Sequence, residues 1–309
     1  IEMAKIEKTD RHATRCLKYK EIDWMASVAK AETSDSVEPG DVILKIDNLK
    51  KYYEVAANAL FGSSGSKKVV KANETLSFEA REGETLAIVG ESGCGKSTLA
   101  KVLMGLETAT EGVVLLDNQS IGATPIENRS TQTVADIQMV FQNPFDTLNP
   151  SMTVGRQIIR ALEIFRFGKS DKARSERMLE LLDLVKLPRA FAERMPRQLS
   201  GGQKQLVALL RGLASNPNII LLDEPFAGVD PIAVEDIQSI ISVLKNKNIG
   251  ILITDHNVQE TLAITDRTYL MFEGRILKEG IPEDLAKDEM VRKVYLGKNF
   301  EFKRKKIDF

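Results

Sequence analysis

The chain has 309 residues, of which 43% are hydrophobic and 28% are charged, a composition typical of a globular protein with one large domain or two small ones. The 43 Lys and Arg residues nearly balance the 44 Asp and Glu residues, so bulk charge does not favour nucleic-acid binding, although local basic patches are not excluded. The two cysteines, Cys16 and Cys94, exclude a disulfide framework and a zinc-binding thiolate cluster. This usage favours a reducing compartment, and we expect the chain in the cytosol.

The longest apolar runs, at 219–222 and 249–253, are far shorter than the roughly 20 residues that a membrane-spanning helix needs. We therefore expect no direct membrane span. The first residues, IEMAKIEKTDRHATR, contain neither an apolar segment nor a small-residue cleavage site, so we do not expect a secretory signal. Because the chain lacks an initiator Met, we also do not expect Ile1 to be the natural start.

Residues 1–39 alternate charged and scattered apolar residues and end in AETSDSVEPG, a cluster typical of a linker. We expect this arm to be poorly ordered. Three strands are then predicted at 41–49, 75–80 and 83–90, because these segments are rich in Val, Ile, Leu or Thr and are bounded by Gly, Asn or Glu.

The segment 150–215 has apolar residues three and four positions apart, which predicts helices at 156–165, 175–185 and 205–214. Strands and helices then alternate, with a buried strand predicted at 219–225, a helix at 232–246, a strand at 249–256, a helix at 258–265 and a strand pair over 268–280. This alternation predicts an α/β fold with a mainly parallel sheet and crossover helices, into which the middle helices are inserted as a subdomain.

Residues 90–98, GESGCGKST, match the phosphate-loop pattern G-x-x-x-x-G-K-[ST] and lie between a predicted strand and a predicted helix. The glycines let the loop turn its N–H groups inward, and the helix start adds positive potential. Lys96 would reach the β and γ phosphates, the Ser97 hydroxyl would bind Mg²⁺, and Thr98 would add a phosphate contact. The alternative is a plain glycine turn, but the strand-loop-helix context favours a nucleotide site.

The segment IILLDEP places two carboxylates at the end of an apolar strand, where open α/β sheets bind ligands. Asp223 would position Mg²⁺ through its water shell. Glu224 would orient or deprotonate the attacking water, because phosphoryl transfer depends on an aligned nucleophile. Taken alone, Asp-Glu-Pro could merely cap the strand, but the phosphate loop favours the catalytic interpretation.

Ser200, in the sequence LSGGQ, lies 104 residues after Lys96 and 23 before Asp223, at the start of a predicted helix. In this order the three motifs resemble those of the nucleotide-binding domain of ABC transporters. The resemblance implies a P-loop NTPase of ABC type over residues 40–295, with a mainly parallel sheet, an antiparallel β subdomain and an inserted helical subdomain at about 145–205.

The LSGGQ segment also has a physical interpretation, because a Ser hydroxyl and Gly N–H groups at a helix start form an anion site. The resemblance implies that this second site covers the γ phosphate bound to the opposite subunit, so that two domains enclose two ATP molecules. Taken alone, SGGQ is equally consistent with a turn.

Four further residues match motifs of the family. Tyr53, in NLKKYYEV, resembles the aromatic residue that stacks on adenine, with Tyr52 as the second candidate and a half-buried strand aromatic as the alternative. Gln142, in MVFQNP, resembles the glutamine that senses Mg²⁺ and contacts the transmembrane partner. Asp230, in FAGVDP, resembles the aspartate of the loop that links the two active sites, and His256, in ILITDH, resembles the histidine that hydrogen-bonds the γ phosphate.

The motifs and the resemblance together imply ATP and Mg²⁺ as cofactors. The implied site comprises Glu224, His256 and Gln142 as catalytic residues, Ser97, Gln142 and Asp223 as magnesium-binding residues, and as nucleotide contacts Tyr53, Gly90, Ser92, Gly93, Gly95, Lys96, Ser97, Thr98, Ser200, Gly201, Gly202, Gln203 and Asp230. Leu206 departs from the family, many members of which have Arg there, and this puts local helix contacts in question without removing a phosphate ligand.

Different parts of the chain resemble two different branches of the family. Residues 1 to about 205 resemble ATPases of dipeptide, oligopeptide and nickel importers, on the stretches VVKANETLSFEAREGETLAIVGESGCGKSTLAKVLMGLE, QMVFQNPFDTLNPSMTVGRQI and MPRQLSGGQKQ. The arm DRHATRCLKYKEIDW resembles the tail of a preceding domain in a tandem protein of that branch. From about residue 213 the sequence is similar to the ATPase of lipopolysaccharide export, and an HPYT-like importer motif is absent. We interpret the chain as a mosaic joined near residues 204–216, either natural or engineered.

The resemblance implies a second nucleotide-binding domain and transmembrane permease subunits as partners, with the chain peripheral to the inner membrane. It implies that the permease groove is built mainly by the Gln142 loop and the helical subdomain, so we expect a peptide permease. Lipopolysaccharide export, or an ATPase without a cognate permease, are the alternatives. We expect the basic tail at 296–309 to be solvated rather than to contact lipid or protein.

An ATPase acting on nucleic acid or the ribosome is the alternative from a different class. DNA-repair members of the superfamily insert a long coiled coil between the phosphate loop and the LSGGQ motif, and the 104-residue interval from Lys96 to Ser200 leaves no room for it. Translation members usually carry two complete domains in one chain. We therefore expect no nucleic-acid partner.

Overall fold

The computed structural model describes residues 4–5, 13–14, 40–55, 68–142, 147–296 and 304. The chain divides into two compact units, Ile1–Ser36 and Val37–Phe309. In the first unit, strand β1 (Ala4–Lys5) pairs antiparallel with β2 (Ala13–Thr14). The predictions for the rest of the 1–39 arm, and for nearly all of the 296–309 tail, fall outside the described residues.

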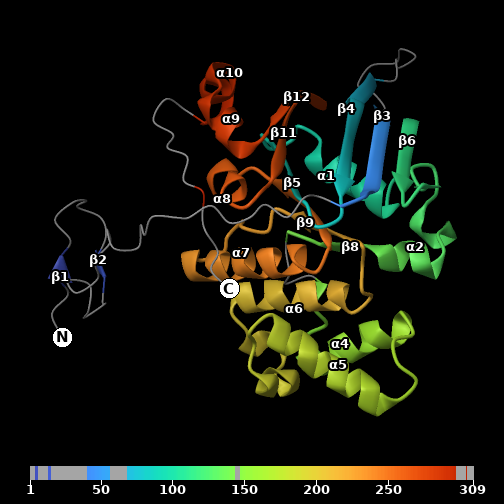
Figure 1. Cartoon of the computed structure of the whole chain (residues 1–309), viewed down its shortest axis with the longest axis vertical. Coiled ribbons are helices and arrows are strands. Elements are labelled where there is room, and N and C mark those ends of the chain that lie inside the picture. The colour runs from blue at the N-terminus through green and yellow to red at the C-terminus, as the bar shows by residue number, and fades with distance from the viewer. Residues whose placement is uncertain are drawn as a thin grey trace, which may run out of the picture. The chain divides into compact units, whose positions relative to one another are not determined.

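The larger sheet of the second unit has five parallel strands and one antiparallel edge strand (Figure 1). Its order is β12-β11-β5-β10-β9-β8, with the bounds Arg275–Gly280, Arg267–Phe272, Thr85–Gly90, Gly250–Asp255, Ile219–Asp223 and Ile137–Val140. The three central strands are buried along their whole length, as expected for parallel strands covered on both faces. The prediction of a mainly parallel α/β sheet is confirmed.

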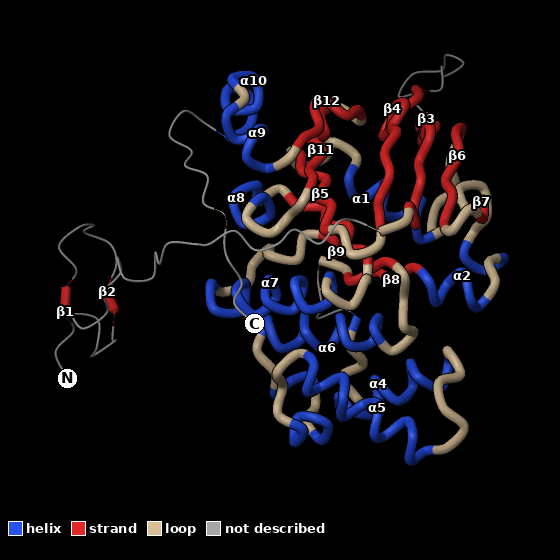
Figure 2. The backbone as a smooth tube through the Cα atoms, in the orientation of Figure 1, coloured by secondary structure: helices blue, strands red, loops and turns tan. Residues whose placement is uncertain are grey.

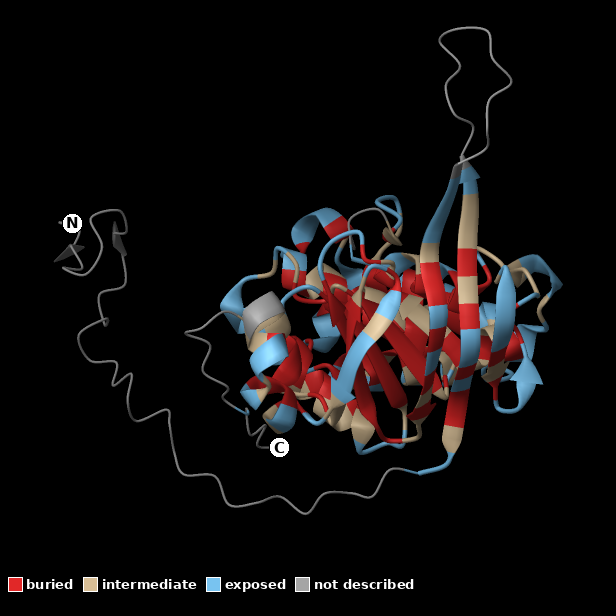
Figure 3. Ribbon diagram, turned by 90° about the horizontal axis from the view of Figure 1, so that it is seen from above, coloured by how far each residue is buried: buried red, intermediate tan, exposed pale blue. Residues whose placement is uncertain are grey.

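A smaller antiparallel sheet has the order β4-β3-β6-β7, with the bounds Lys68–Arg81, Val42–Val55, Glu111–Leu116 and Gln119–Ser120. Strands β3 and β4 extend well beyond the predicted strands at 41–49 and 75–80. Buried and exposed residues alternate along parts of both strands (Figure 3), the pattern of a sheet with one face on a core.

Helices cover the larger sheet and form a separate layer beside it (Figure 2). The α-helices are α1 (Lys96–Met104), α2 (Thr131–Asp136), α4 (Val154–Ile164), α5 (Asp171–Leu184), α6 (Gly201–Leu213), α7 (Pro231–Lys245), α8 (Val258–Leu262), α9 (Pro282–Lys287) and α10 (Glu289–Val291). The 3₁₀-helices are η2 (Ile126–Asn128), η3 (Arg189–Glu193) and η4 (Pro196–Gln198), and η5 (Arg292–Leu296) is a π-helix. Within the described segments, every helix is too short or too polar to cross a membrane.

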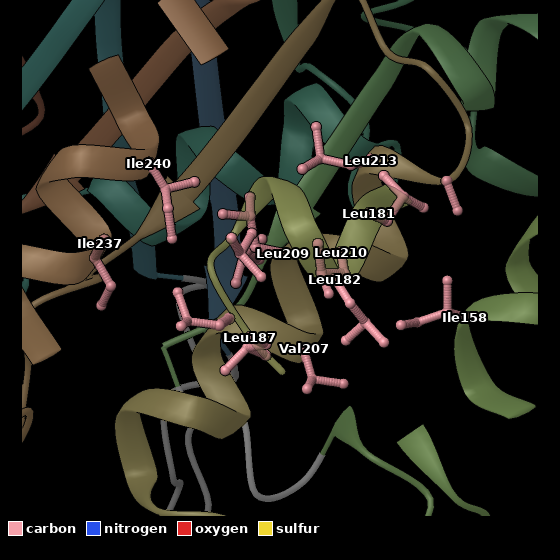
Figure 4. Close-up of a cluster of buried hydrophobic side chains, with 14 of the residues drawn as sticks. Ile158, Leu181, Leu182, Leu187, Val207, Leu209, Leu210, Leu213, Ile237 and Ile240 are labelled. Carbon is pink, nitrogen blue, oxygen red and sulfur yellow. The ribbon is translucent and has the colours of Figure 1, made fainter. Parts of the chain in front are cut away.

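One hydrophobic core joins the helical layer to the larger sheet. Side chains of α4, α5, α6 and α7, including Ile158, Leu181, Leu210 and Ile237, pack together (Figure 4) and continue into Ile220 of β9. A second core lies between α1, the smaller sheet and the other face of the larger sheet. The helical layer is therefore packed closely against strands of the larger sheet.

Candidate functional site

The phosphate loop connects the end of β5 to the start of α1. Gly95 has φ 109° and is the N-cap of α1, a conformation open to glycine and strained for other residues. A Cβ at Gly90 would lie 2.6 Å from the carbonyl oxygen of Met271 and would overlap the Cys94 sulfur. Gly90 and Gly95 are therefore required by the close approach of neighbouring groups and by the loop's backbone conformation.

The ammonium group of Lys96 is enclosed by the loop that precedes it. Lys96 is only 4% exposed, and its Nζ donates to the carbonyl oxygens of Gly90 at 2.5 Å and Glu91 at 3.0 Å. Ser97 is exposed at the same helix start, and Thr98 is half-buried. This arrangement presents one cation and one hydroxyl at the positive end of α1, a suitable environment for an anion.

The remaining loop residues differ in burial. Ser92 and Gly93 are exposed, and Gly93 has φ 83° with open space around its Cα. Cys94 is buried, and burial raises the pKa of its thiol, which keeps it protonated and unreactive at neutral pH. We therefore assign no chemistry to Cys94.

Asp223 lies at the carboxyl end of β9, where the register aligns it with Thr254 of β10. Its side chain is nearly buried, and its Oδ1 accepts a hydrogen bond of 2.5 Å from the Thr254 hydroxyl. Burial raises the pKa of Asp223, and the Thr254 hydrogen bond opposes this shift by stabilising the carboxylate. The carboxylate is thus held in one orientation at the sheet edge.

Glu224 follows Asp223 in an unusual backbone conformation with φ 47°. A left-handed glutamate costs about 1 kcal/mol or more, and here the Glu224 N–H compensates with a 2.6 Å hydrogen bond to the Thr254 carbonyl oxygen. Gln142 donates to Oε2 of Glu224 at 2.8 Å, and Nδ1 of His256 lies 3.1 Å from the same oxygen. The three predicted catalytic residues therefore meet at one carboxylate.

Asp255 adds a carboxylate to this cluster that the sequence interpretation missed. It is fully buried, and its Oδ1 lies 3.5 Å from Nδ1 of His256 and accepts from the Asn257 N–H at 2.7 Å. Burial raises the pKa of Asp255, partly offset by these neighbours. The sequence signal for Asp255 was its position directly before His256 at the end of a predicted strand. Such strand ends lie together at the edge of the sheet where ligands bind.

The LSGGQ residues form the start of α6. Ser200 Oγ accepts from the Gln203 N–H at 3.2 Å, and Gln203 Oε1 accepts from the Ser200 N–H at 3.1 Å, which closes a capping box. Among the described residues, neither Ser200 nor Asp230 forms a hydrogen bond or an ion pair with the phosphate loop. Asp230 instead caps α7 by accepting from the Ala233 N–H at 3.0 Å.

The two glycines of LSGGQ differ in what surrounds them, which allows a matched test. A Cβ at Gly202 would overlap the Cβ of Ala233 on α7, whereas a Cβ at Gly201 would meet nothing within 4 Å. Gly202→Ala should therefore destabilise the fold by about 1–3 kcal/mol through overpacking, measured by urea unfolding. Gly201→Ala is the control and should change stability by less than about 1 kcal/mol; equal losses would contradict the packing explanation.

The two candidate adenine-stacking tyrosines lie side by side in sequence on β3. The Tyr52 hydroxyl donates to Oε1 of Glu74 at 2.6 Å, and this hydrogen bond raises the pKa of Tyr52. The Tyr53 ring is half-buried with Lys51 Nζ 4.9 Å from its centroid. Because the Tyr52 hydroxyl is engaged by Glu74, Tyr53 stays the stronger candidate for the stacking role.

The oxygen donors of the site suit Mg²⁺. Among the described residues there is no group of three or more His, Cys, Asp or Glu side chains placed to hold a metal ion. Mg²⁺ does not need such a cage, because it is usually bound by one or two carboxylates together with substrate phosphates. The Ser97 hydroxyl, the Asp223 carboxylate and the Gln142 amide oxygen fit this chemistry.

Comparison with known proteins gives close matches over most of the chain. The family described as ABC transporter matches residues 73–227. The lipopolysaccharide export system ATP-binding protein LptB of Haemophilus influenzae is 35% identical over 262 residues, covering 84% of this chain and 99% of that protein. The oligopeptide transport ATP-binding protein OppF of Bacillus subtilis is 32% identical over 249 residues, covering 80% and 78%.

Solved structures agree with this assignment. The dimeric, post-hydrolysis ATP-binding cassette MJ0796 bound to ADP and Pi matches with a TM-score of 0.66 and 28% identity, covering 77% of this chain and 98% of that one. CbiO1 from Clostridium perfringens, part of the ABC transporter complex CbiONQ, matches with a TM-score of 0.67 and 28% identity, covering 82% and 94%.

The parallel sheet, the phosphate loop and these matches define the chain as an ATPase. It belongs to the ABC transporter family, as an ATP-hydrolysing transporter subunit. Relatives named for lipopolysaccharide export and for oligopeptide transport both occur, which agrees with the interpretation of the chain as a mosaic.

Proposed function

We propose that the chain binds ATP at the phosphate loop, hydrolyses it through the Glu224 cluster and drives a membrane permease. The observation that carries this proposal is the meeting of Gln142, Glu224 and His256 at the carboxyl ends of adjacent strands. Strand β5, which is parallel to β10 in the same sheet, leads into the phosphate loop at that edge. Open α/β sheets bind their ligands there.

In the proposed reaction, Lys96 exchanges its carbonyl partners for phosphate oxygens, and the loop N–H groups hold the β and γ phosphates. Bound Mg²⁺ would neutralise phosphate charge, held by Ser97, Asp223 and Gln142. Glu224 aligns the attacking water and accepts its proton, because an ionised carboxylate can act as a general base.

His256 and Gln142 orient the Glu224 carboxylate in this mechanism. Both approach the same oxygen, Oε2, so the other oxygen, Oε1, is the one available to the water. The buried Asp255 lies beside His256 Nδ1 and would hold the ring in one orientation. The opposite ring nitrogen, Nε2, is then the atom directed toward the γ phosphate.

The LSGGQ residues are proposed to act on the ATP bound by a second subunit. Ser200 and Gly201 are exposed at the start of α6, where N–H groups and the helix potential favour an anion. The relative MJ0796 is described as dimeric and bound to ADP and Pi, which supports a pair of subunits. Self-association of this chain at saturating ATP distinguishes a second copy of the chain from a different subunit.

A groove beside the site is the proposed permease-docking surface. It has a volume of about 190 Å³ and is lined by β8, α4 and α6, including the exposed Phe141 and Ile164 and the half-buried Arg211. An apolar groove with exposed large side chains is a typical site for an amphipathic helix. The relative CbiO1 is described as part of the ABC transporter complex CbiONQ, which supports docking of this chain to other transporter subunits.

The lining of this groove favours a peptide permease. Most of its residues lie in the stretch from Gln138 to Phe165, the part of the chain that resembles peptide importers. Export of lipopolysaccharide is the second candidate, because the match to this chain spans nearly the whole length of an LptB relative. Groove residues in direct contact with the permease would decide the partner more strongly than overall sequence identity does.

The test is ATPase activity of the purified chain, alone and reconstituted with a peptide-importer permease pair or a lipopolysaccharide-export pair. We expect stimulation by the first pair only. Ile164→Asp should remove most of this stimulation, whereas Leu106→Asp, an equally exposed leucine outside the groove, should keep it. Stimulation by the export pair alone would show that the C-terminal third of the chain decides the partner, and stimulation by neither would leave an ATPase without a permease.

A further inference from the structure

Two carbonyl oxygens of the phosphate loop are held from outside the loop. The Gly274 N–H donates to the Cys94 oxygen at 2.9 Å, and Nδ2 of Asn73 donates to the Gly95 oxygen at 3.1 Å. The two donors are themselves linked, because the N–H of Glu74 donates to the Gly274 oxygen at 2.7 Å. Asn73 of β4 and Gly274 of the β11–β12 turn thus form a clamp on the loop.

The clamp orients the N–H groups that follow these carbonyls. In a trans peptide the C=O and the next N–H point in opposite directions. Holding the Cys94 and Gly95 oxygens outward therefore directs the N–H groups of Gly95 and Lys96 toward the inside of the loop. Inward N–H groups are the ones that bind phosphate.

The clamp depends on a close approach that only glycine allows at the turn. Gly274 has φ 77° and follows Glu273 with φ 46°, the conformation of a two-residue hairpin turn. A Cβ at Gly274 would lie 2.8 Å from the carbonyl oxygen of Ala72 on β4. The turn can therefore reach Cys94 and β4 together only with glycine at this position.

Asn73 is difficult to explain by folding alone. It is fully buried, and its Oδ1 has no hydrogen-bond partner among the described residues, which costs stability in a low-dielectric interior. The Gly95 oxygen already accepts the helical hydrogen bond from the Leu99 N–H at 3.0 Å, so the fold does not need a second donor there. A leucine of similar size would bury no polar atom. The amide is thus better suited to orienting the loop than to stabilising the chain.

We propose that Asn73 is a positioning residue for nucleotide binding, which holds the Gly95 peptide so that the loop N–H groups face the phosphates. The proposal rests on the phosphate-binding role of the loop described above. Asn73 does not touch the nucleotide and acts through Gly95. Its effect is therefore specific to ligands that carry phosphate groups.

The test compares the affinities of the full chain for ADP and for adenosine, by titration calorimetry, in Asn73→Leu and Asn73→Ala. Both variants remove the donor, but leucine fills the site and alanine leaves a cavity, so their thermal stabilities should differ. We expect the ADP dissociation constant to rise about tenfold in both variants, with adenosine affinity within about twofold of wild type. Asn73→Leu should unfold at or above the wild-type temperature.

Gln238→Leu is the matched control, because Gln238 is also a buried amide that donates to a carbonyl oxygen, that of Glu260, away from the phosphate loop. It should leave the ratio of ADP to adenosine affinity unchanged. Unchanged ADP affinity in both Asn73 variants, or equal losses for ADP and adenosine, would overturn the positioning role. If Lys96→Ala binds ADP like wild type, the phosphate site itself is wrong and this proposal fails with it.

Discussion

Glu224→Gln should lower the rate of ATP hydrolysis by about 10²- to 10⁴-fold, the usual contribution of a general base, while ATP still binds. The amide keeps the shape of the carboxylate and can still contact Gln142 and His256, but it cannot accept a proton from water. Steady-state phosphate release measures the rate, and titration with ATP measures binding. Turnover at the wild-type rate would rule out the proposed base.

The same variant tests the shared site, because ATP that is bound but not hydrolysed should hold two subunits closed. Light scattering at saturating ATP should report a dimer that returns to monomer when ATP is removed. Glu176→Gln, on the exposed face of α5 and paired there with Lys172, should hydrolyse ATP normally. A strict monomer of Glu224→Gln at saturating ATP would argue that two copies of this chain do not assemble.

Lys96→Ala should abolish measurable hydrolysis and weaken ADP binding by about 10²-fold, because charge-assisted hydrogen bonds contribute about 1.5–3 kcal/mol each. The ammonium is nearly buried within the loop at the start of α1, so water replaces it poorly. Lys101→Ala is the control, since Lys101 lies on the same helix with its side chain exposed. Thermal unfolding without nucleotide shows whether the variant is folded.

A folded Lys96→Ala variant with wild-type turnover would overturn the assignment of the phosphate site. A variant that unfolds would instead indicate that the Gly90 and Glu91 carbonyl oxygens need the ammonium for stability. Lys96→Arg separates these cases, because it keeps the charge for the carbonyl partners but changes the geometry offered to phosphate.

The phosphate loop could be predicted because its chemistry is contiguous. Gly95 must adopt a left-handed φ directly before Lys96, and the strand and helix on either side are marked by their own apolar patterns. The strand lengths were harder to predict. Strand β3 continues through Lys50 and Lys51, but two consecutive charged residues hide this part of the strand from an apolar pattern. The strand tolerates Lys50 because it forms an ion pair with Glu111 on the neighbouring strand.

The role of Glu224 was predicted from the IILLDEP segment, whereas the roles of Gln142 and His256 were predicted through resemblance and not through spacing. Gln142 and Glu224 are separated by 82 residues, and no local pattern states that their side chains meet. Asp255 was missed for the same reason, because its relation to His256 depends on where β10 ends. Asn73 was missed because an amide within a predicted strand region gives no sign that it faces Gly95.

The sequence by itself determined the class of protein, since the phosphate loop, LSGGQ and IILLDEP occur together in the order that resembles the ABC family, although the last two are ambiguous when taken alone. Only the tertiary structure decided which oxygen of Glu224 is engaged, which glycine of LSGGQ is packed, and that Asn73 and Gly274 hold the loop from outside. The physical reason is that these contacts join strands far apart in the chain. The order and register of the sheets bring them together, and no local periodicity encodes that order.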